Sequence, residues 1–141
     1  MDKKISVLVI EDEADIRDLL RRTLRFEGFD VYSAADGSQG LEIALRQQPD
    51  VILLDWVMPK MDGMEVLSEL RRDERTKDII VFMLTAKNMM KDVSMALTNG
   101  ANDYIVKPFD GDTLGSRIMS MLQVLREQKA ENGCDSAKMT C

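Results

Sequence analysis

The sequence predicts an α/β fold in which five parallel strands alternate with five helices. Three observations support this fold. Apolar runs of strand length recur along the chain, amphipathic segments with helical spacing separate them, and acids, a threonine or a lysine stand where the runs end. Right-handed crossovers then place the strands in one sheet with helices on both faces. With 141 residues and no internal repeat, we expect one domain.

The central strand is predicted at residues 51–55, where four apolar residues precede Asp55. A continuous apolar run is typical of a strand that is buried on both faces. Pro59 cannot continue a central strand, so the strand ends close to Asp55. The remaining strands are predicted at residues 5–10, 30–34, 79–84 and 103–106.

The helices are predicted from apolar residues spaced three and four apart. In the first helix the inward stripe is Ile16, Leu19, Leu20, Thr23 and Leu24. Gly28 is expected to end this helix in the left-handed conformation, and Asp36 to cap the start of the second.

Three further helices are expected, at about residues 63–70, 89–97 and 114–125. The charged residues 71–78 are predicted to form a loop after the first of these. Residues 128–141 are polar and lack apolar periodicity, so we expect a domain at residues 1–127 and a flexible tail at residues 128–141.

Composition excludes several classes of function. The formal net charge of −6 would repel a phosphate backbone, so we expect no direct nucleic-acid partner. No apolar run approaches membrane-spanning length, and no secretory signal precedes the first strand. The chain has no histidine, which excludes Ser-His and Cys-His nucleophilic sites and histidine zinc centres. Cys134 and Cys141 lie outside the predicted core, which fits a reducing cytoplasm.

Residues able to carry chemistry gather at the predicted strand ends: Glu11, Asp12, Asp55, Thr85 and Lys107. Open α/β sheets bind their ligands at the carboxyl ends of the strands. If the first and third strands are neighbours, as in the flavodoxin-like order 2-1-3-4-5, Asp55 meets the two acids that follow the first strand.

Such a set of side chains suits phosphoryl transfer. Carboxylate oxygens are ligands for Mg²⁺, which keeps further positions for water and phosphate oxygens. A lysine, a threonine and Mg²⁺ together can neutralise a phosphoryl group during its transfer. A carboxylate such as that of Asp55 can accept this group as an acyl phosphate.

The same residues occur in short motifs: Glu11-Asp12, Leu54-Asp55, Met58-Pro59-Lys60-Met61-Asp62-Gly63, Leu84-Thr85-Ala86 and Lys107-Pro108-Phe109. Their order along the chain, from about Ile5 to Leu125, resembles that in receiver domains of bacterial two-component response regulators, which are CheY-like. The resemblance implies that Asp55 accepts a phosphoryl group from a sensor histidine kinase or a histidine phosphotransfer protein. It also implies a Mg²⁺ ion held by Glu11, Asp12, Asp55 and the backbone carbonyl of Val57.

Further roles follow from the resemblance alone. Lys107 would pair with the phosphoryl group and Thr85 would hydrogen-bond to it. Tyr104 lies where the family keeps a switch aromatic, although core filling remains an alternative for this residue. The Lys107–Pro108 bond is typically cis in relatives.

The resemblance also implies the kind of output. It implies a cytoplasmic protein, a monomer or weak dimer, that is no enzyme beyond promoting its own phosphorylation and dephosphorylation. Its output face would be the fourth helix, the fifth strand and the last helix. Because no DNA-binding or catalytic region follows Leu125, we expect this face to contact a downstream protein.

Three positions depart from the family's most familiar pattern. Val57 and Lys87 lie two residues beyond Asp55 and Thr85, where side chains flank the path of the hydrolytic water and tune phosphoryl lifetime. Valine cannot orient water, so we hypothesise a long-lived phosphoaspartate. Glu11 replaces one possible aspartate, and its extra methylene would route the metal contact through water.

Two alternatives remain. One is a phosphatase with an aspartyl nucleophile, but such sites usually need a second acid where this chain has Val57. The other is a degenerate receiver that acts as an unphosphorylated interaction module, against which the intact set of five polar residues argues. Nucleotide binding is disfavoured because the chain has neither a Walker loop nor a Gly-x-Gly-x-x-Gly turn.

Overall fold

A computed structural model describes residues 4–86, 93–107 and 114–124. The chain divides into two units, Met1–Phe109 and Asp110–Cys141, and each is described by itself. The second contains a helix at residues 114–124. The expected tail lies outside the described residues, so the boundary at residue 127 stays a prediction.

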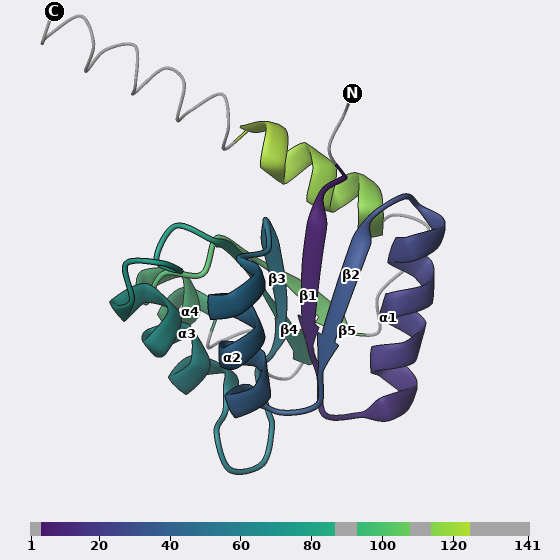
Figure 1. Cartoon of the computed structure of the whole chain (residues 1–141). Helices are drawn as coiled ribbons and strands as arrows, with labels where there is room; N and C mark the ends of the chain where they lie inside the picture. The colour runs from purple at the N-terminus through teal and green to yellow at the C-terminus, as the bar shows by residue number, and fades with distance from the viewer. Residues whose placement is uncertain (1–3, 87–92, 108–113, 125–141) are drawn as a thin grey trace, which may run out of the picture. The chain divides into compact units, whose positions relative to one another are not determined.

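The first unit confirms the predicted parallel sheet. Its strands are ordered β2-β1-β3-β4-β5, so β1 and β3 are neighbours. They are β1 (Ser6–Ile10), β2 (Asp30–Ala34), β3 (Val51–Asp55), β4 (Ile80–Ala86) and β5 (Asp103–Lys107) (Figure 1). Both β4 and β5 extend beyond their predicted ends and include Thr85 and Lys107, because parallel pairing continues through Ala86 and Lys107.

The described part of this unit also contains four helices: α1 (Ala14–Phe26), α2 (Gly37–Gln47), α3 (Gly63–Arg72) and α4 (Val93–Thr98). Figure 1 shows α2, α3 and α4 on one side of the sheet and α1 on the other. The predicted start of the fourth helix at Met89 lies outside the described residues. Within the described part of the chain, no helix is long and apolar enough to span a membrane.

Every second residue of the central strands joins one hydrophobic core, because side chains alternate between the faces of a sheet. Its strand members, which pack with buried residues of α2, α3 and α4, are Leu8, Ile10, Ile52, Leu54, Val81 and Met83. Leu20 and Leu24 are the buried residues of α1. Burial of β3 along its full length confirms that it is a central strand.

The helix ends agree with the predicted signals. Asp36 Oδ1 accepts a hydrogen bond from the Gln39 N–H at 2.7 Å and caps α2. Gly28 has φ 98°, the left-handed conformation expected after α1. The predicted inward stripe of α1 is wrong at Leu19, which is 47% exposed, because the stripe follows Leu20 and Leu24 and leaves Leu19 on its flank.

Candidate functional site

The strand order brings three carboxylates together at one edge of the sheet. Ile10 and Leu54 are paired across β1 and β3, so Glu11 and Asp55 follow them side by side. One carboxylate oxygen from each of Glu11, Asp12 and Asp55 lies within 4.8 Å of the others. The expected meeting of these acids is therefore confirmed as geometry.

Lys107 lies between two of these acids. Its Nζ donates hydrogen bonds to Glu11 Oε1 at 2.8 Å and to Asp55 Oδ1 at 3.0 Å. Glu11 is fully buried and Asp55 is 4% exposed, so both carboxylates have lost most of their water. Two buried carboxylates facing one ammonium leave the pocket with an excess of negative charge, which is costly to bury unless a further cation or proton balances it.

The pKa values reflect this imbalance. Burial, with Glu11 alongside, raises the pKa of Asp55 to about 8, although Lys107 opposes the rise. Burial acts to lower the pKa of Lys107, but its hydrogen bonds to Glu11 and Asp55 outweigh burial and raise it. Lys107 therefore stays charged, while the raised pKa of Asp55 favours its protonated form. A hard divalent cation, which prefers oxygen ligands, fits such a pocket. Asp12 is half-buried, so its carboxylate forms the more accessible side of the pocket.

The backbone around Glu11 is held by contacts that the sequence did not indicate. The Glu11 N–H donates to Ala34 O at 3.1 Å. Glu11 Oε2 accepts the N–H of Glu13 at 3.2 Å, and the Glu11 carbonyl accepts from Arg17 Nη1 at 2.9 Å. Since its other carboxylate oxygen binds Lys107, each polar group of Glu11 has a partner.

Thr85 lies close to the acids in the register of the sheet, but its hydroxyl group hydrogen-bonds to a different partner. Thr85 is 1% exposed, and its Oγ1 donates to the carbonyl of Ala86 at 3.3 Å. Tyr104 is partly buried and packs against the hydrophobic core, a position compatible with core filling and with a switch. The proposed roles of both residues stay predictions.

Of the two positions that are expected to tune phosphoryl lifetime, Val57 and Lys87, the structure describes only Val57. The Val57 side chain is 65% exposed, so it borders solvent beside β3. Lys87 and Pro108 lie outside the described residues. The Val57 carbonyl as a metal ligand also stays a prediction.

Gly63, the first residue of α3, passes directly against the backbone of Asp55. A Cβ at this position would lie 2.6 Å from Asp55 O and 2.8 Å from Trp56 Cα. The Gly63 N–H donates to Trp56 O at 2.8 Å. Only glycine permits this approach, which fixes the loop that follows Asp55.

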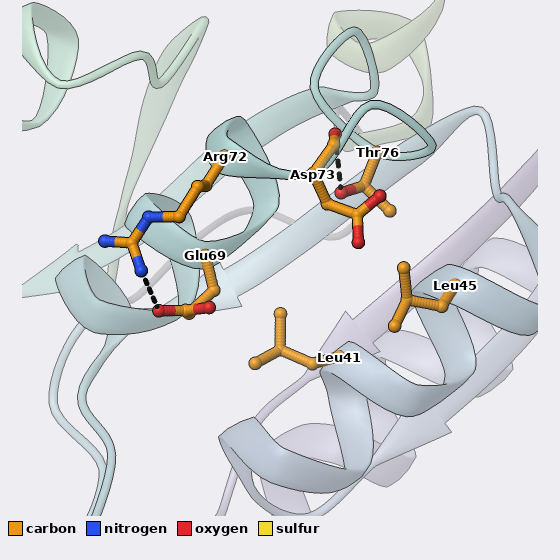
Figure 2. A pocket seen from close by; sticks show the side chains of 6 residues that line it. All are labelled: Leu41, Leu45, Glu69, Arg72, Asp73 and Thr76. Atoms are coloured by element: carbon orange, nitrogen blue, oxygen red, sulfur yellow. Dashed lines mark hydrogen bonds and ion pairs between the residues drawn. The ribbon is translucent and has the colours of Figure 1, made fainter.

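A separate groove lies between α2 and α3 and has a volume of about 190 Å³. Figure 2 shows its lining residues, Leu41, Leu45, Glu69, Arg72, Asp73 and Thr76. Its charged side chains are paired: Arg72 with Glu69 at 2.9 Å, and Asp73 with Arg75 at 2.9 Å. None of the predicted site residues lines it, so the site chemistry belongs to the acidic edge.

Comparison with known proteins identifies the family. Residues 7–119 match the family described as response regulator receiver domain. The chain belongs to this family. A solved receiver-like neighbour, the Vibrio cholerae chemotaxis protein CheY4, has 31% sequence identity and a TM-score of 0.80, covering 84% of this chain and 99% of that one.

Curated relatives of the receiver are longer proteins. The chain is 44% identical over 117 residues to the Synechocystis sp. DNA-binding dual master transcriptional regulator RpaA, covering 83% of this chain and 48% of that protein. It is 43% identical over 130 residues to the probable transcriptional regulator ycf27 of Porphyridium aerugineum, covering 92% of this chain and 53% of that protein. The receiver thus spans about half the length of these relatives.

These relatives correct the expected set of partners. The expectation of no nucleic-acid partner, with a protein as the only output, is wrong, because the first relative is by name a DNA-binding regulator. The net charge of −6 describes these 141 residues alone. It gives no information on the half of such regulators that the receiver does not cover.

Proposed function

We propose that this receiver takes a phosphoryl group onto Asp55 from a phosphohistidine on a sensor kinase or phosphotransfer protein. The observation that carries the proposal is the contact of Lys107 Nζ with Asp55 Oδ1 at 3.0 Å, in a buried pocket that also holds Glu11. Receiver domains are signalling modules, and this geometry supports the phosphoacceptor role over that of an unphosphorylated interaction module.

The reaction requires a carboxylate oxygen as the nucleophile and a positively charged group that neutralises the transferred phosphoryl group. An Asp55 oxygen attacks the phosphorus of the donor, a P–O bond forms as the P–N bond breaks, and the leaving imidazole takes up a proton. Lys107 holds Oδ1 and orients the carboxylate so that the second oxygen can attack. The same ammonium then neutralises negative charge on the transferred group.

We propose Mg²⁺ as the cofactor, held by Glu11, Asp12, Asp55 and the carbonyl of Val57. The three side chains fit a hard cation because their oxygens converge within 4.8 Å. Bound there, the ion would keep the carboxylates ionised and supply positive charge to the phosphoryl oxygens. This is consistent with the pKa of Asp55, which burial and the neighbouring Glu11 raise to about 8 in the metal-free protein.

The switch begins at Thr85. Its hydroxyl, which donates to Ala86 O in this structure, would turn toward the phosphoryl group, and Tyr104 would follow on the neighbouring strand. The surface that α4 and β5 present would then change its contacts. The names of the curated relatives support control of transcription as the output. A cytoplasmic location also remains a prediction.

The test is phosphorylation by a small-molecule donor. We expect acetyl phosphate with Mg²⁺ to add the mass of one phosphoryl group to the wild type and none to Asp55→Asn. Asp30→Asn, which removes an exposed acid on β2, is the matched control and should be modified like the wild type. Modification of Asp55→Asn, or of no variant at all, contradicts the proposal. Turnover of an aryl phosphate would instead favour the phosphatase alternative.

A further inference from the structure

Arg17 is a cation placed beside the acidic pocket without touching any of its carboxylates. It lies in the first part of α1 and is half-buried, and its side chain donates to two backbone carbonyls. Arg17 Nη1 donates to Glu11 O at 2.9 Å and, more weakly, to Asp12 O at 3.4 Å. One guanidinium nitrogen therefore bridges the two residues that follow β1.

The location of this charge is unfavourable for the helix. A cation near a helix N-terminus opposes the helix dipole, and Glu13, the N-cap of α1, supplies no side-chain cap. The two carbonyl contacts compensate for this placement, because a hydrogen bond from a charged donor is stronger than one between neutral groups. The stabilised element is the loop between β1 and α1.

We infer that Arg17 is a positioning residue that holds the carbonyls of Glu11 and Asp12 so that both carboxylates face Asp55. The inference rests on the proposed function, since it concerns the same metal site. Lys107 fixes the Glu11 side chain from the β5 side, and Arg17 fixes the Glu11 backbone from the α1 side. Among the described residues no partner holds the Asp12 side chain, so its orientation depends most on its backbone, which Arg17 contacts.

This role and a purely electrostatic role predict opposite changes in metal affinity. If Arg17 acted only through its charge, its removal would strengthen Mg²⁺ binding, because one repelling cation would be lost. If Arg17 holds the loop, its removal weakens binding, because the carboxylates must be ordered when the ion binds. Partners that orient metal ligands typically change affinity by about 10-fold or more when they are removed.

The experiment compares Arg17→Met with Arg22→Met, an exposed position on the same helix that removes the same charge. Mg²⁺ is titrated against the fluorescence of Trp56, the only tryptophan, which directly follows Asp55. We expect the Kd of Arg17→Met to rise roughly 10-fold. Arg22→Met should bind like the wild type or slightly more tightly. Arg17→Lys, which keeps the charge but not the geometry of the guanidinium, should lie between them.

A second measurement is independent of the metal. In the metal-free protein, the N–H of Glu13, which donates to Glu11 Oε2, should exchange with solvent faster in Arg17→Met than in Arg22→Met. If Arg17→Met does not fold, as judged by circular dichroism, Arg17→Lys is tested by both measurements.

The outcomes separate the two proposals. An Arg17→Met variant that binds Mg²⁺ as tightly as the wild type, with unchanged exchange of Glu13, overturns the positioning role. A wild type in which Mg²⁺ has no effect on Trp56 or on the melting temperature contradicts the proposed metal site instead. The exchange measurement then still decides whether Arg17 holds the loop.

Discussion

Lys107 and Glu11 form an ion pair at 2.8 Å although 96 positions separate them in the chain. Lys107 ends β5, Glu11 directly follows β1, and Asp55, which also binds Lys107, ends β3. The pocket is therefore complete only when these three strands occupy their observed order. Because Lys107 is shared with Glu11, it offsets only part of the rise in the pKa of Asp55.

This sharing predicts how the stability of the metal-free protein depends on pH. The pKa of Asp55 is raised from an ordinary value of 3.8 to about 8 in the folded state. The stability that the bound proton contributes is fully present below about pH 4 and is lost as pH rises through about 8. The raised pKa of Lys107 does not change the stability between about pH 4 and pH 8, because Lys107 stays protonated in both the folded and the unfolded state.

The measurement is the free energy of unfolding by urea between pH 5 and pH 8 in the presence of a chelator. We expect the stability of the wild type to fall relative to that of Asp55→Asn, with a slope of at most about 1.4 kcal/mol per pH unit. Asparagine cannot titrate, so the variant corrects for all other groups. Parallel curves for the two proteins would contradict the raised pKa.

Metal binding is predicted to stabilise the fold. A ligand that binds only the folded state adds about 2.7 kcal/mol at 100 times its Kd. We expect Mg²⁺ to raise the melting temperature of the wild type and to change the fluorescence of Trp56, which is 7% exposed. Asp12→Ala should lose most of both effects.

Asp15→Asn is the matched control for Asp12→Ala, because Asp15 is an exposed acid at the start of α1. It removes one negative charge near the site but no proposed ligand. Equal loss of the Mg²⁺ response in both variants would indicate a diffuse charge effect in place of a built site.

The sequence was sufficient for the alternation of strands and helices and for the gathering of Glu11, Asp12, Asp55 and Lys107, whereas the strand order came from the resemblance to receiver domains. Continuous apolar runs marked the buried strands, and residues at the carboxyl ends of parallel strands must share one edge. The runs alone placed the ends of β4 and β5 too early, since Thr85 and Lys107 are polar residues that the ladder still includes.

The arginines that hold the β1–α1 loop and the end of α3 could not be found in this way. Arg17 and Arg71 donate hydrogen bonds to backbone carbonyls. Because every residue has a backbone carbonyl, the sequence pattern does not reveal such partners. The charged residues 71–78 were predicted to form a loop, but Arg71 and Arg72 end α3. A cation where the helix dipole disfavours it was the only available signal for Arg17.

Arg71 is predicted to contribute strongly to stability. Its guanidinium donates to Ile79 O at 2.7 Å, to Lys77 O at 2.9 Å and to Gly100 O at 2.7 Å. These contacts connect the end of α3 to the segments that precede β4 and β5. Burial lowers the pKa of Arg71, which shows how far the group is removed from water.

We expect Arg71→Met to lower the free energy of unfolding by about 3 kcal/mol, because several carbonyls lose a charged donor. Arg72→Met is the control, since the Arg72 side chain is 70% exposed and its ion pair with Glu69 is a surface pair. We expect Arg72→Met to lower the free energy of unfolding by less than about 1 kcal/mol. Equal costs in urea unfolding would show that the carbonyl contacts of Arg71 are energetically unimportant.

The final prediction concerns the lifetime of the phosphorylated state and depends on the proposed acceptor role of Asp55. Val57 is 65% exposed and two residues beyond Asp55, where a polar side chain would meet incoming water. Valine can neither donate nor accept a hydrogen bond, so it leaves the attacking water unoriented. Phosphorylated Val57→Asn should therefore lose its phosphoryl group faster than the wild type. Removal of the donor followed by mass measurement over time gives the two decay rates.

Val57→Ala separates polarity from size in this experiment. Alanine opens the path to Asp55 but offers no hydrogen bond, so its decay rate should stay close to that of the wild type if orientation of water controls hydrolysis. If Val57→Ala decays as fast as Val57→Asn, steric shielding by valine sets the lifetime. If neither variant differs from the wild type, this position has no influence on hydrolysis and the hypothesis is wrong.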